Sequence, residues 1–285
     1  MTERYIGTRQ TATWESAILG PDEPPAVSVE RIGGESAFFL TCDHASNRIP
    51  RRLGTLQLDS EHLERHIAWD VGAAGVARGL SDRLDATLVL QNYSRLIIDC
   101  NRSPGVDSSI PVVSEATPIP GNEAIHPDHA RARAREIFHP YHDRIGAELN
   151  ARQALARPTV LVAVHSFTPV FHGKARPWEI GVLYNRDRRL AQAMLEQLAA
   201  ETDLQVGDNE PYTVNDATDY TIPVHGERRG IPHVEIEIRQ DLIESSSAQE
   251  QWAELLARLL SSSLGRLGLC TGPRHLEGHD RCLAR

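Results

Sequence analysis

The chain has 285 residues, of which 40% are hydrophobic and 24% are charged. These proportions are typical of a folded globular protein and exclude a disordered or collagen-like chain. Its 39 acidic residues outnumber 30 basic ones, giving a formal net charge of -9. Because this charge repels phosphate backbones, we expect no general binding of nucleic acid. The 13 histidines indicate metal binding or acid–base chemistry, since imidazole serves both roles near neutral pH.

Membrane and secretory signals are missing from the sequence pattern. No run approaches the roughly 18 to 20 apolar residues of a membrane helix, so we expect no membrane partner. Residues 1–10 contain no apolar core of a signal peptide. The four cysteines have no paired spacing and are expected to be reduced thiols. Together these features predict a cytoplasmic protein.

Three segments divide the chain by composition. Residues 1–34, which contain Gly-Pro and Pro-Pro breakers, are expected to form an N-terminal lead-in. Residues 35–265 hold all the strong helix and strand patterns and are predicted to be one catalytic domain. Residues 266–285 form a polar C-terminal tail.

Within the central segment, apolar runs alternate with helical patterns. Strands are predicted, in chain order, over residues 36–42, 87–90, 96–98, 159–164, 179–184 and 233–238. Helices are predicted over residues 60–84, 130–149, 188–200 and 247–265, with Pro140 expected to kink or split the second. Long loops occupy residues 103–122 and 218–230. This alternation predicts an α/β domain whose sheet is covered on both faces and binds ligands at the carboxyl ends of its strands.

Two of the predicted strands end in histidine. His44 follows the run Phe-Phe-Leu-Thr-Cys-Asp, and His165 follows Val-Leu-Val-Ala-Val. A strand fixes the backbone behind each imidazole, as a metal site requires, although either histidine alone could be a polar strand cap. A catalytic zinc site usually has three protein ligands. The third candidate is Asp70 or Asn47, and Asp70 is favoured because an amide is a poor zinc ligand.

The same region offers a second arrangement. His62, His66 and Asp70 are spaced i, i+4, i+8 and would share one face of the predicted helix over 60–84. Two histidines at this spacing can bind one zinc ion. However, the glutamate base of the His-Glu-x-x-His proteases is missing, so a solvated polar face is the simpler interpretation.

Arg102 and Asn101 come shortly after the apolar run 96–98, which we expect to be a strand. An arginine at a strand end can bind a carboxylate through two parallel hydrogen bonds, and Asn101 could donate from its amide. The alternative is an ion pair of Arg102 with Asp99 or Asp107 that anchors the loop.

Two glutamates lie on one face of the predicted strand 233–238. Glu235 or Glu237 could take a proton from water and pass it to a leaving amine. The alternative is an edge strand with its glutamates in solvent. Glu237 is preferred as the base because it lies at the carboxyl end, beside Arg239.

Further polar groups could contact a substrate. Tyr141 and His142 lie at the predicted helix break, and His225 lies in the second long loop. Tyr212 and Tyr220 belong to segments that could cover a bound molecule. Each of these residues, taken singly, is more often structural.

Taken together, these motifs resemble the N-formylglutamate amidohydrolase family, which looks related to the zinc carboxypeptidase-like hydrolases. The matching pieces run in the family's order over residues 36–245. They are Asp-His-Ala-Ser-Asn-Arg-Ile-Pro at 43–50, Trp-Asp at 69–70, Ser-Arg-Leu-Ile-Ile-Asp-Cys-Asn-Arg at 94–102, Pro-Tyr-His at 140–142, Val-His-Ser at 164–166 and Glu-Ile-Glu at 235–237.

The resemblance implies a zinc-peptidase-like α/β fold with a central mixed sheet flanked by helices, and one zinc ion. His44, Asp70 and His165 would hold zinc, and Asn101 and Arg102 would bind the substrate carboxylate. Other groups near the substrate would be Tyr141, His142 and His225. Glu237 would activate the attacking water. The implied reaction is hydrolysis of an N-acyl amino acid such as N-formyl-L-glutamate.

Two departures leave the substrate open. Asp43-His44-Ala45-Ser46 stands where better-known members have Pro-His-Ser-Gly, and the loop over 103–122 also differs. The enzyme is therefore expected to act on N-formylglutamate or on another small N-acylated or amidated acid. The alternatives are a zinc carboxypeptidase or aminoacylase, and a non-catalytic relative that binds carboxylates.

Overall fold

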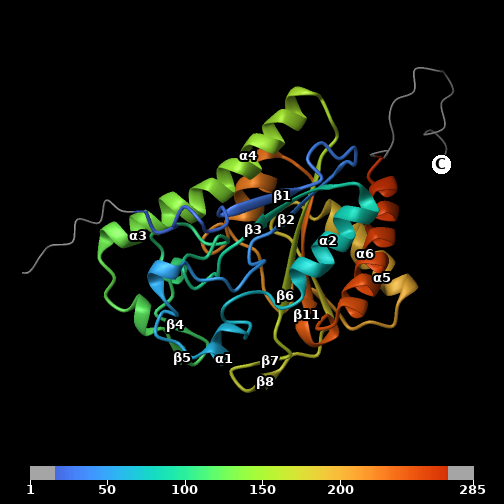
Figure 1. The fold of residues 1–285 in the computed structure, drawn as a ribbon. Helices are drawn as coiled ribbons and strands as arrows, with labels where there is room; N and C mark the ends of the chain where they lie inside the picture. The colour runs from blue at the N-terminus through green and yellow to red at the C-terminus, as the bar shows by residue number, and fades with distance from the viewer. Residues whose placement is uncertain (1–16, 269–285) are drawn as a thin grey trace, which may run out of the picture.

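A seven-stranded sheet runs through the middle of the computed structural model, which describes residues 17–268 (Figure 1). The strand order is β1-β3-β2-β6-β11-β9-β10. The β1–β3 and β11–β9 pairs are antiparallel and the other four pairs are parallel. The strands are β1 (Val27–Glu30), β2 (Phe38–Cys42), β3 (Thr87–Gln91), β6 (Val160–Phe167), β9 (Ile180–Leu183), β10 (Val206–Asp208) and β11 (His233–Arg239). The predicted α/β domain with a mixed sheet is confirmed.

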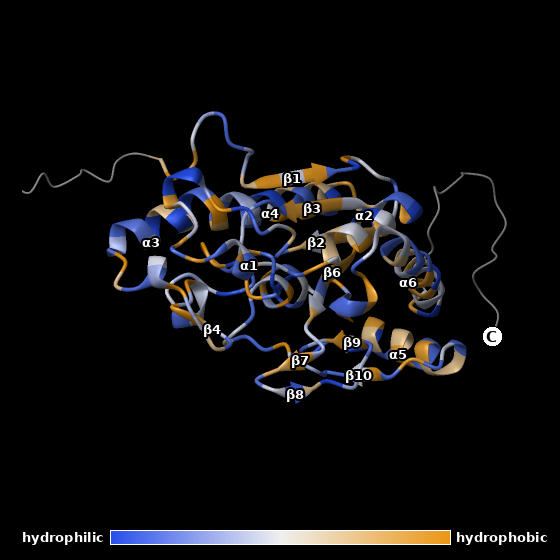
Figure 2. Cartoon of the chain, turned by 60° about the horizontal axis from the view of Figure 1, so that its bottom comes forward, coloured by the Kyte–Doolittle hydropathy of each residue, from blue (hydrophilic) through white to orange (hydrophobic). Residues whose placement is uncertain are grey.

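Helices cover both faces of this sheet. On one face lie α2, α5 and α6, whose apolar side chains share a core with the sheet, and α4 packs on the other face. In Figure 2 the strands of the sheet are mainly hydrophobic, whereas the helices alternate between hydrophilic and hydrophobic residues. The helices are α1 (Ser60–Leu63), α2 (Ala73–Leu84), α3 (Pro127–Arg133), α4 (His139–Ala154), α5 (Arg189–Glu201) and α6 (Ser246–Arg266).

Side chains along the central strands alternate between the two faces of the sheet, so every second residue points away from the core that α2, α5 and α6 form. In β11, Val234, Ile236 and Ile238 enter the core beneath α2, α5 and α6. Because strand side chains alternate between faces, Glu235 and Glu237 point to the opposite face. Both glutamates are buried, since β11 lies between β6 and β9 and is not an edge strand. The solvent-facing alternative for these glutamates is therefore wrong.

The helix predicted over 60–84 is broken in the middle. Residues 64–72 form turns between α1 and α2, so Asp70 lies in a connection and not on a helix. Gly72 precedes α2 with a φ of 79°, and a Cβ there would lie 2.3 Å from the carbonyl oxygen of Ile243. This conformation is available to glycine at little cost, and α2 begins directly after it, whereas α1 has already ended at Leu63.

The strand predicted over 96–98 is also wrong. Residues 94–102 form turns, in which the Ser94 hydroxyl accepts from the amide of Leu96 at 3.2 Å. The carbonyls of Leu96 and Ile97 accept from the side chains of Asn122 (2.8 Å) and Arg133 (2.9 Å). Since these distant side chains satisfy the backbone, the apolar run is buried without joining the sheet.

Other elements differ in detail. A π-helical segment (Ala134–Phe138) joins α3 to α4, and Pro140 lies in the first turn of α4, so the helix changes its hydrogen-bond pattern just before this proline but is not split by it. The second predicted long loop contains another π-helical segment (Ile222–Gly226). Within the expected lead-in, β1 adds the outer strand beside β3. Most of the expected tail lies outside the described residues, and residue 266 is the last of α6.

Two small hairpins lie beside the sheet, near the carboxyl ends of β6 and β11 (Figure 1). The first pairs β4 (Val113–Ser114) with β5 (Thr117–Pro118), and the second pairs β7 (Val170–Phe171) with β8 (Lys174–Ala175). Among the described helices, none is long and apolar enough to cross a bilayer.

Candidate active site

A cavity of about 510 Å³ opens where β2, β6 and β11 end. Its inner wall includes His44, which follows β2, His165 from β6 and Glu237 from β11. The parallel pairing of β6 with β11 places Glu237 directly beside His165 in register. This is the end of a parallel sheet at which ligands bind in α/β proteins.

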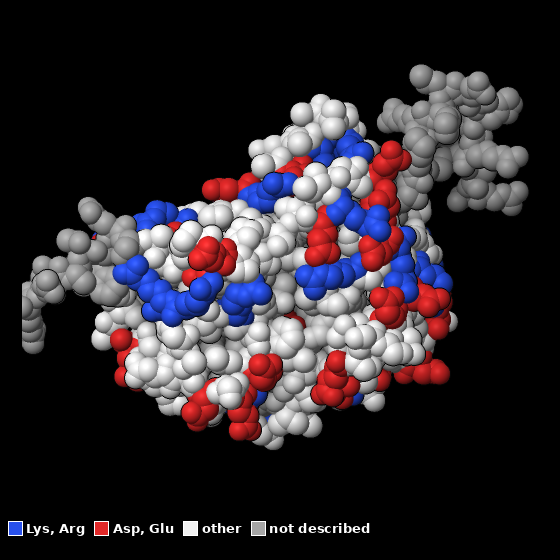
Figure 3. Space-filling view, in the orientation of Figure 1, with Lys and Arg blue, Asp and Glu red and all other residues white. Residues whose placement is uncertain are grey.

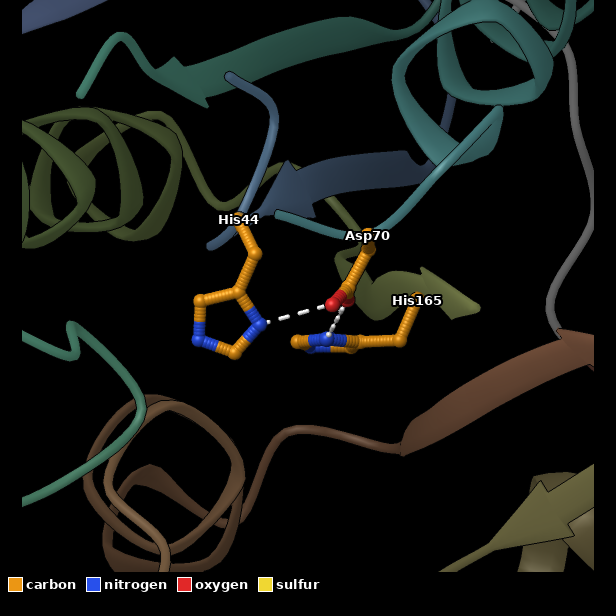
Figure 4. A group of neighbouring side chains, drawn as sticks. All are labelled: His44, Asp70 and His165. Atoms are coloured by element: carbon orange, nitrogen blue, oxygen red, sulfur yellow. Dashed lines mark hydrogen bonds and ion pairs between the residues drawn. The ribbon is translucent and has the colours of Figure 1, made fainter. Parts of the chain in front are cut away.

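Three buried residues converge inside this cavity. The Nδ1 atoms of His44 and His165 lie 3.2 Å and 2.8 Å from one Asp70 carboxylate oxygen (Figure 4). One candidate ligand atom from each residue lies within 4.8 Å of the other two. The structure thus brings together the three residues proposed from the sequence as metal ligands, with Asp70 supplied by the connection before α2. Two imidazole nitrogens and one carboxylate oxygen form a donor set that zinc accepts.

The outer nitrogen of each imidazole faces another carboxylate, through a hydrogen bond for His44 and an ion-pair contact for His165. His44 Nε2 lies 2.8 Å from an Asp99 oxygen, and His165 Nε2 lies 3.2 Å from an Asp43 oxygen. In turn, the Tyr141 hydroxyl donates to the other oxygen of Asp43 at 2.6 Å. Outer carboxylates of this kind fix the tautomer and ring orientation of metal-ligating histidines. Here they direct both Nδ1 atoms toward Asp70.

Opposite charges compensate this buried cluster. Arg95 contacts Asp99 at 2.6 Å and Asp70 at 3.3 Å. Burial alone would raise the pKa of Asp43, but the hydrogen bond and charge of His165 lower it to about 2. Burial and Arg95 would lower the pKa of His44, yet the Asp99 and Asp70 carboxylates raise it above its ordinary value. The cluster therefore favours ionised carboxylates around its imidazoles.

The two glutamates of β11 behave in the opposite way. Burial raises the pKa of Glu235 to about 7 and raises that of Glu237 well above its ordinary value, although His165 lowers both. Within the described part of the chain, the Oε2 atom of each has no hydrogen-bond partner. A buried carboxyl group with one free oxygen and a raised pKa is suited to exchange a proton with a bound molecule.

Arg102 lines the cavity on the side of Asp219. Its Nη1 donates to an Asp219 oxygen at 2.9 Å, so its ion pair is not with Asp99 or Asp107. The side-chain carbonyl of Asn101 accepts from the amides of Tyr220 and Thr221, each at 3.0 Å. Asn101 thereby holds the 220–221 segment beside Arg102, while both side chains line the cavity.

Other sequence candidates lie away from the cavity surface. Tyr141, His142 and His225 are buried behind its wall and do not line it. His142 Nδ1 lies 3.0 Å from His225 Nε2, and its Nε2 donates to the Cys100 carbonyl at 2.7 Å. Burial lowers the pKa of His142 to about 4 and that of His225 to about 3. Both are therefore neutral at physiological pH.

The second metal arrangement is not formed. With the helix broken, His62 and His66 are not in the ligand cluster with Asp70, and His66 instead pairs with Glu115 at 3.2 Å. The amide of Asn47 donates to the Leu63 carbonyl at 3.0 Å. Asn47 is thus used to anchor the turn after α1.

Four charged residues of the site were not singled out as its components from the sequence. Asp43 and Asp99 contact the histidines, Arg95 neutralises the carboxylates, and Asp219 pairs with Arg102. Asp43 directly precedes His44, so its position at a strand end was a usable signal. Asp219 is 117 residues from Arg102 and offered none.

The chain resembles one protein family and several solved structures. The model of the N-formylglutamate amidohydrolase family matches residues 36–244. The crystal structure of gene product Atu2144 from Agrobacterium tumefaciens is 42% identical, with a TM-score of 0.85 over 88% of this chain and 99% of that one. N-formylglutamate amidohydrolase from Ralstonia eutropha JMP134 shares the fold at 16% identity, with a TM-score of 0.59 over 86% of this chain and 97% of that one. Curated sequences gave no match.

The family match covers well over half of the chain and includes every cavity residue discussed above. The chain belongs to the N-formylglutamate amidohydrolase family and is a hydrolase that acts on linear amide bonds.

Proposed function

We propose that this hydrolase is zinc-dependent and cleaves the amide of a small N-acyl amino acid, with N-formyl-L-glutamate as the reference substrate. One observation carries the proposal: His44 Nδ1 and His165 Nδ1 converge with the Asp70 carboxylate in a cavity at the strand ends. The family suggests the reaction, and the donor set suggests the metal.

The residues fit a zinc ion by their chemistry. Both imidazoles present Nδ1 to the same point because Asp99 and Asp43 hold their outer nitrogens. The three ligands are nitrogen, nitrogen and oxygen, as in catalytic zinc sites that keep a fourth position open. When bound there, zinc would lower the pKa of water toward about 7 and polarise an amide carbonyl.

Glu237 is the proposed general base. It lies beside His165 in register, with one carboxyl oxygen free. In this role it accepts a proton from the attacking water and returns it to the nitrogen of the leaving amine. The carbonyl carbon gains a C–O bond as the C–N bond breaks, which yields a carboxylic acid and a free amine. Glu235 lies two residues earlier on the same face, deeper along β11, and is the alternative base.

Arg102 is proposed to bind the carboxylate of the substrate. Its Nη1 donates to Asp219 and to the backbone carbonyl of Asn101, so the other edge of the guanidinium is available to a ligand. The overall charge of -9 does not attract an anion. On the face in Figure 3, acidic side chains lie along the lower edge, where Figure 1 places the hairpins. Attraction of an anionic substrate must therefore come from groups inside the cavity.

We also propose a cytoplasmic location. Cys42 and Cys100 are free and buried, as expected for thiols in a reducing compartment.

The test combines metal content with a substrate panel. The purified protein is expected to contain about one zinc per chain and to release glutamate from N-formyl-L-glutamate. N-acetyl-L-glutamate and a peptide-linked glutamate are assayed in parallel. Cleavage of the peptide alone would identify a carboxypeptidase, and absence of zinc after reconstitution would favour a carboxylate-binding protein.

A further inference from the structure

We propose that the outer wall of the cavity binds a bulky apolar acyl group, so that the preferred substrate carries an acyl chain larger than formyl. This acyl wall consists of Val113, Phe171 and Tyr212, which all line the cavity. The inference rests on the proposed function, because it assumes that the cavity binds an N-acyl amino acid.

The size of the cavity is the first argument. Its volume of about 510 Å³ equals that of roughly 17 water molecules at ~30 Å³ each. A formyl group adds only one carbon and one oxygen to the amino acid. A cavity of this size falls in the range of pockets that enclose ligands larger than a formylated amino acid, although most of the residues that line it are polar.

The composition of the outer wall is the second argument. The proposed metal ligands and the two glutamates of β11 lie at the inner end, whereas the two hairpins and the Tyr212 segment bring apolar side chains to the outer part, beside the ion-paired Glu115 and His66. Val113 is 54% exposed and Tyr212 is 40% exposed. When a ligand covers apolar groups that are exposed at the mouth of a cavity, their burial contributes favourably to the free energy of binding.

The acyl wall is held in place before any ligand binds. Phe171 comes from β7, and Tyr212 comes from a segment more than forty residues later. Arg176 joins them, because its guanidinium carbon lies 4.5 Å from the Phe171 ring centre and 4.7 Å from that of Tyr212. Its Nη1 also donates to the Tyr212 hydroxyl at 2.9 Å. These cation–π contacts keep both rings in a fixed arrangement.

Glu115 fixes the remaining member of the wall. It lies in the turn between β4 and β5, two residues after Val113, and accepts from the backbone amide of His172 at 3.1 Å. Its other oxygen accepts from Arg65 at 3.0 Å. Glu115 thus connects the two hairpins to each other and to the turn after α1, so the acyl wall has a defined structure without a ligand.

The position of the wall indicates which end of the substrate it would contact. Arg102 pairs with Asp219 at 2.9 Å, and Asn101 next to it holds the amides of Tyr220 and Thr221. Tyr212 lies on the Glu237 side, because the carbonyl of Glu210, two residues earlier, lies against Gly181, the register partner of Glu237 on β9. With the substrate carboxylate at Arg102 and the amide at the histidine cluster, the acyl group extends toward Phe171 and Tyr212.

The first experiment compares N-benzoyl-L-glutamate with N-formyl-L-glutamate, so that only the acyl group changes. We expect the wild-type zinc enzyme to show a kcat/KM at least about tenfold higher for the benzoyl substrate. Phe171→Ala should reduce that value about tenfold or more and change the formyl value by less than about twofold. Val170→Ala is the matched control, because Val170 neighbours Phe171 on β7, is 48% exposed and does not line the cavity.

The second experiment measures binding, independently of turnover. Calorimetric titration of N-benzoyl-L-glutamate into zinc-loaded Glu237→Gln should give a Kd that weakens about tenfold when Phe171→Ala is added. Val113→Ala and Tyr212→Ala provide the same comparison if Phe171→Ala does not fold. An equal loss of kcat/KM for both substrates in Phe171→Ala, or a wild-type preference for the formyl substrate, would overturn the proposal of an acyl wall. Neither result would contradict the proposed zinc amidohydrolase activity. If neither substrate is cleaved, the proposed function fails, and an unchanged Kd in the Phe171 variant would then also reject the wall.

Discussion

This protein contains two pairs of buried histidines, and within each pair the two rings lie close together. The surroundings of the two pairs shift their pKa values in opposite directions. His44 and His165 have ring centres 5.1 Å apart, and those of His142 and His225 are 5.2 Å apart. Carboxylates raise the pKa of both imidazoles of the first pair despite burial: Asp99 and Asp70 act on His44, and Glu235, then Asp43 and Asp70, act on His165. In the described part of the chain no carboxylate bonds to the ring nitrogens of the second pair, and burial lowers its pKa values to about 4 and about 3.

The comparison shows that the partners of a histidine decide its role more than its burial does. In the second pair, the His142 ring packs at a tilt against Phe138 and Tyr220, and its two nitrogens bond to His225 and to the Cys100 carbonyl. It is a neutral structural link. In the first pair, Asp99 and Asp43 occupy the outer nitrogens and leave both Nδ1 atoms directed at Asp70. Only this pair is arranged to bind a metal.

The sharpest way to break this comparison is to remove one histidine from each pair. We expect His165→Ala to lose bound zinc and to lower kcat/KM by about 10⁴-fold or more, because two ligands cannot hold a catalytic zinc. His225→Ala should retain about one zinc per chain and much of the activity. Metal analysis and hydrolysis of N-formyl-L-glutamate provide both readouts. Zinc loss in the His225 variant, or retention in the His165 variant, would reverse the assignment.

The next effect separates metal binding from proton transfer. Glu237→Gln should keep zinc but lower kcat by about 10²- to 10⁴-fold, since an amide cannot accept the proton of the attacking water. Glu235→Gln is the matched control on the same strand face, and we expect a smaller loss. Zinc content and steady-state kinetics are measured together for both variants. A fully active Glu237→Gln would move the base to Glu235.

The first histidine pair also shows how much of the site the sequence could predict. His44 and His165 were recognisable because each follows an apolar run that becomes a buried strand. The sequence also indicates Asp70 as a candidate ligand, but on a helix over 60–84 that in the structure ends at Leu63 and begins again only at Ala73. Glu237 was identified correctly as a cavity residue, whereas the burial of β11 depends on neighbouring strands that come from distant parts of the chain.

The sequence predictions for residues 96–98 and for the ion pair of Arg102 fail for the same physical reason. The run over 96–98 has the composition of a strand, yet Asn122 and Arg133 satisfy its carbonyls from other segments. Likewise, the pairing of Arg102 with Asp219 joins residues 117 positions apart. Periodicity and local motifs contain no information about such contacts. They predicted the sheet and its functional end, but not the network of charges behind the histidines.

A smaller loss, in zinc affinity, tests whether Asp43 and Asp99 are what distinguishes the first histidine pair from the second. Asp43→Asn and Asp99→Asn should each weaken zinc binding about 10- to 100-fold, because the amide no longer holds the outer imidazole nitrogen as a charged acceptor. Competition with a zinc chelator gives the affinity without relying on activity. Asp203→Asn, an exposed position on the surface, is the control. Unchanged affinity in both site variants would show that His44 and His165 need no outer carboxylates.

The smallest effect concerns the second pair and the pH dependence of stability. The pKa of His142 is about 4 in the folded protein and about 6.5 when unfolded, so the unfolded chain binds more protons between these values. The free energy of unfolding therefore decreases as the pH falls through 6.5 toward 4, and His142 accounts for about 2 kcal/mol of the loss between pH 7 and pH 5. His142→Gln, which cannot titrate, should show a correspondingly shallower decrease in urea denaturation at those two pH values. Parallel losses in the variant and the wild type would mean that folding does not lower the pKa of His142, and the contrast between the two pairs would then disappear.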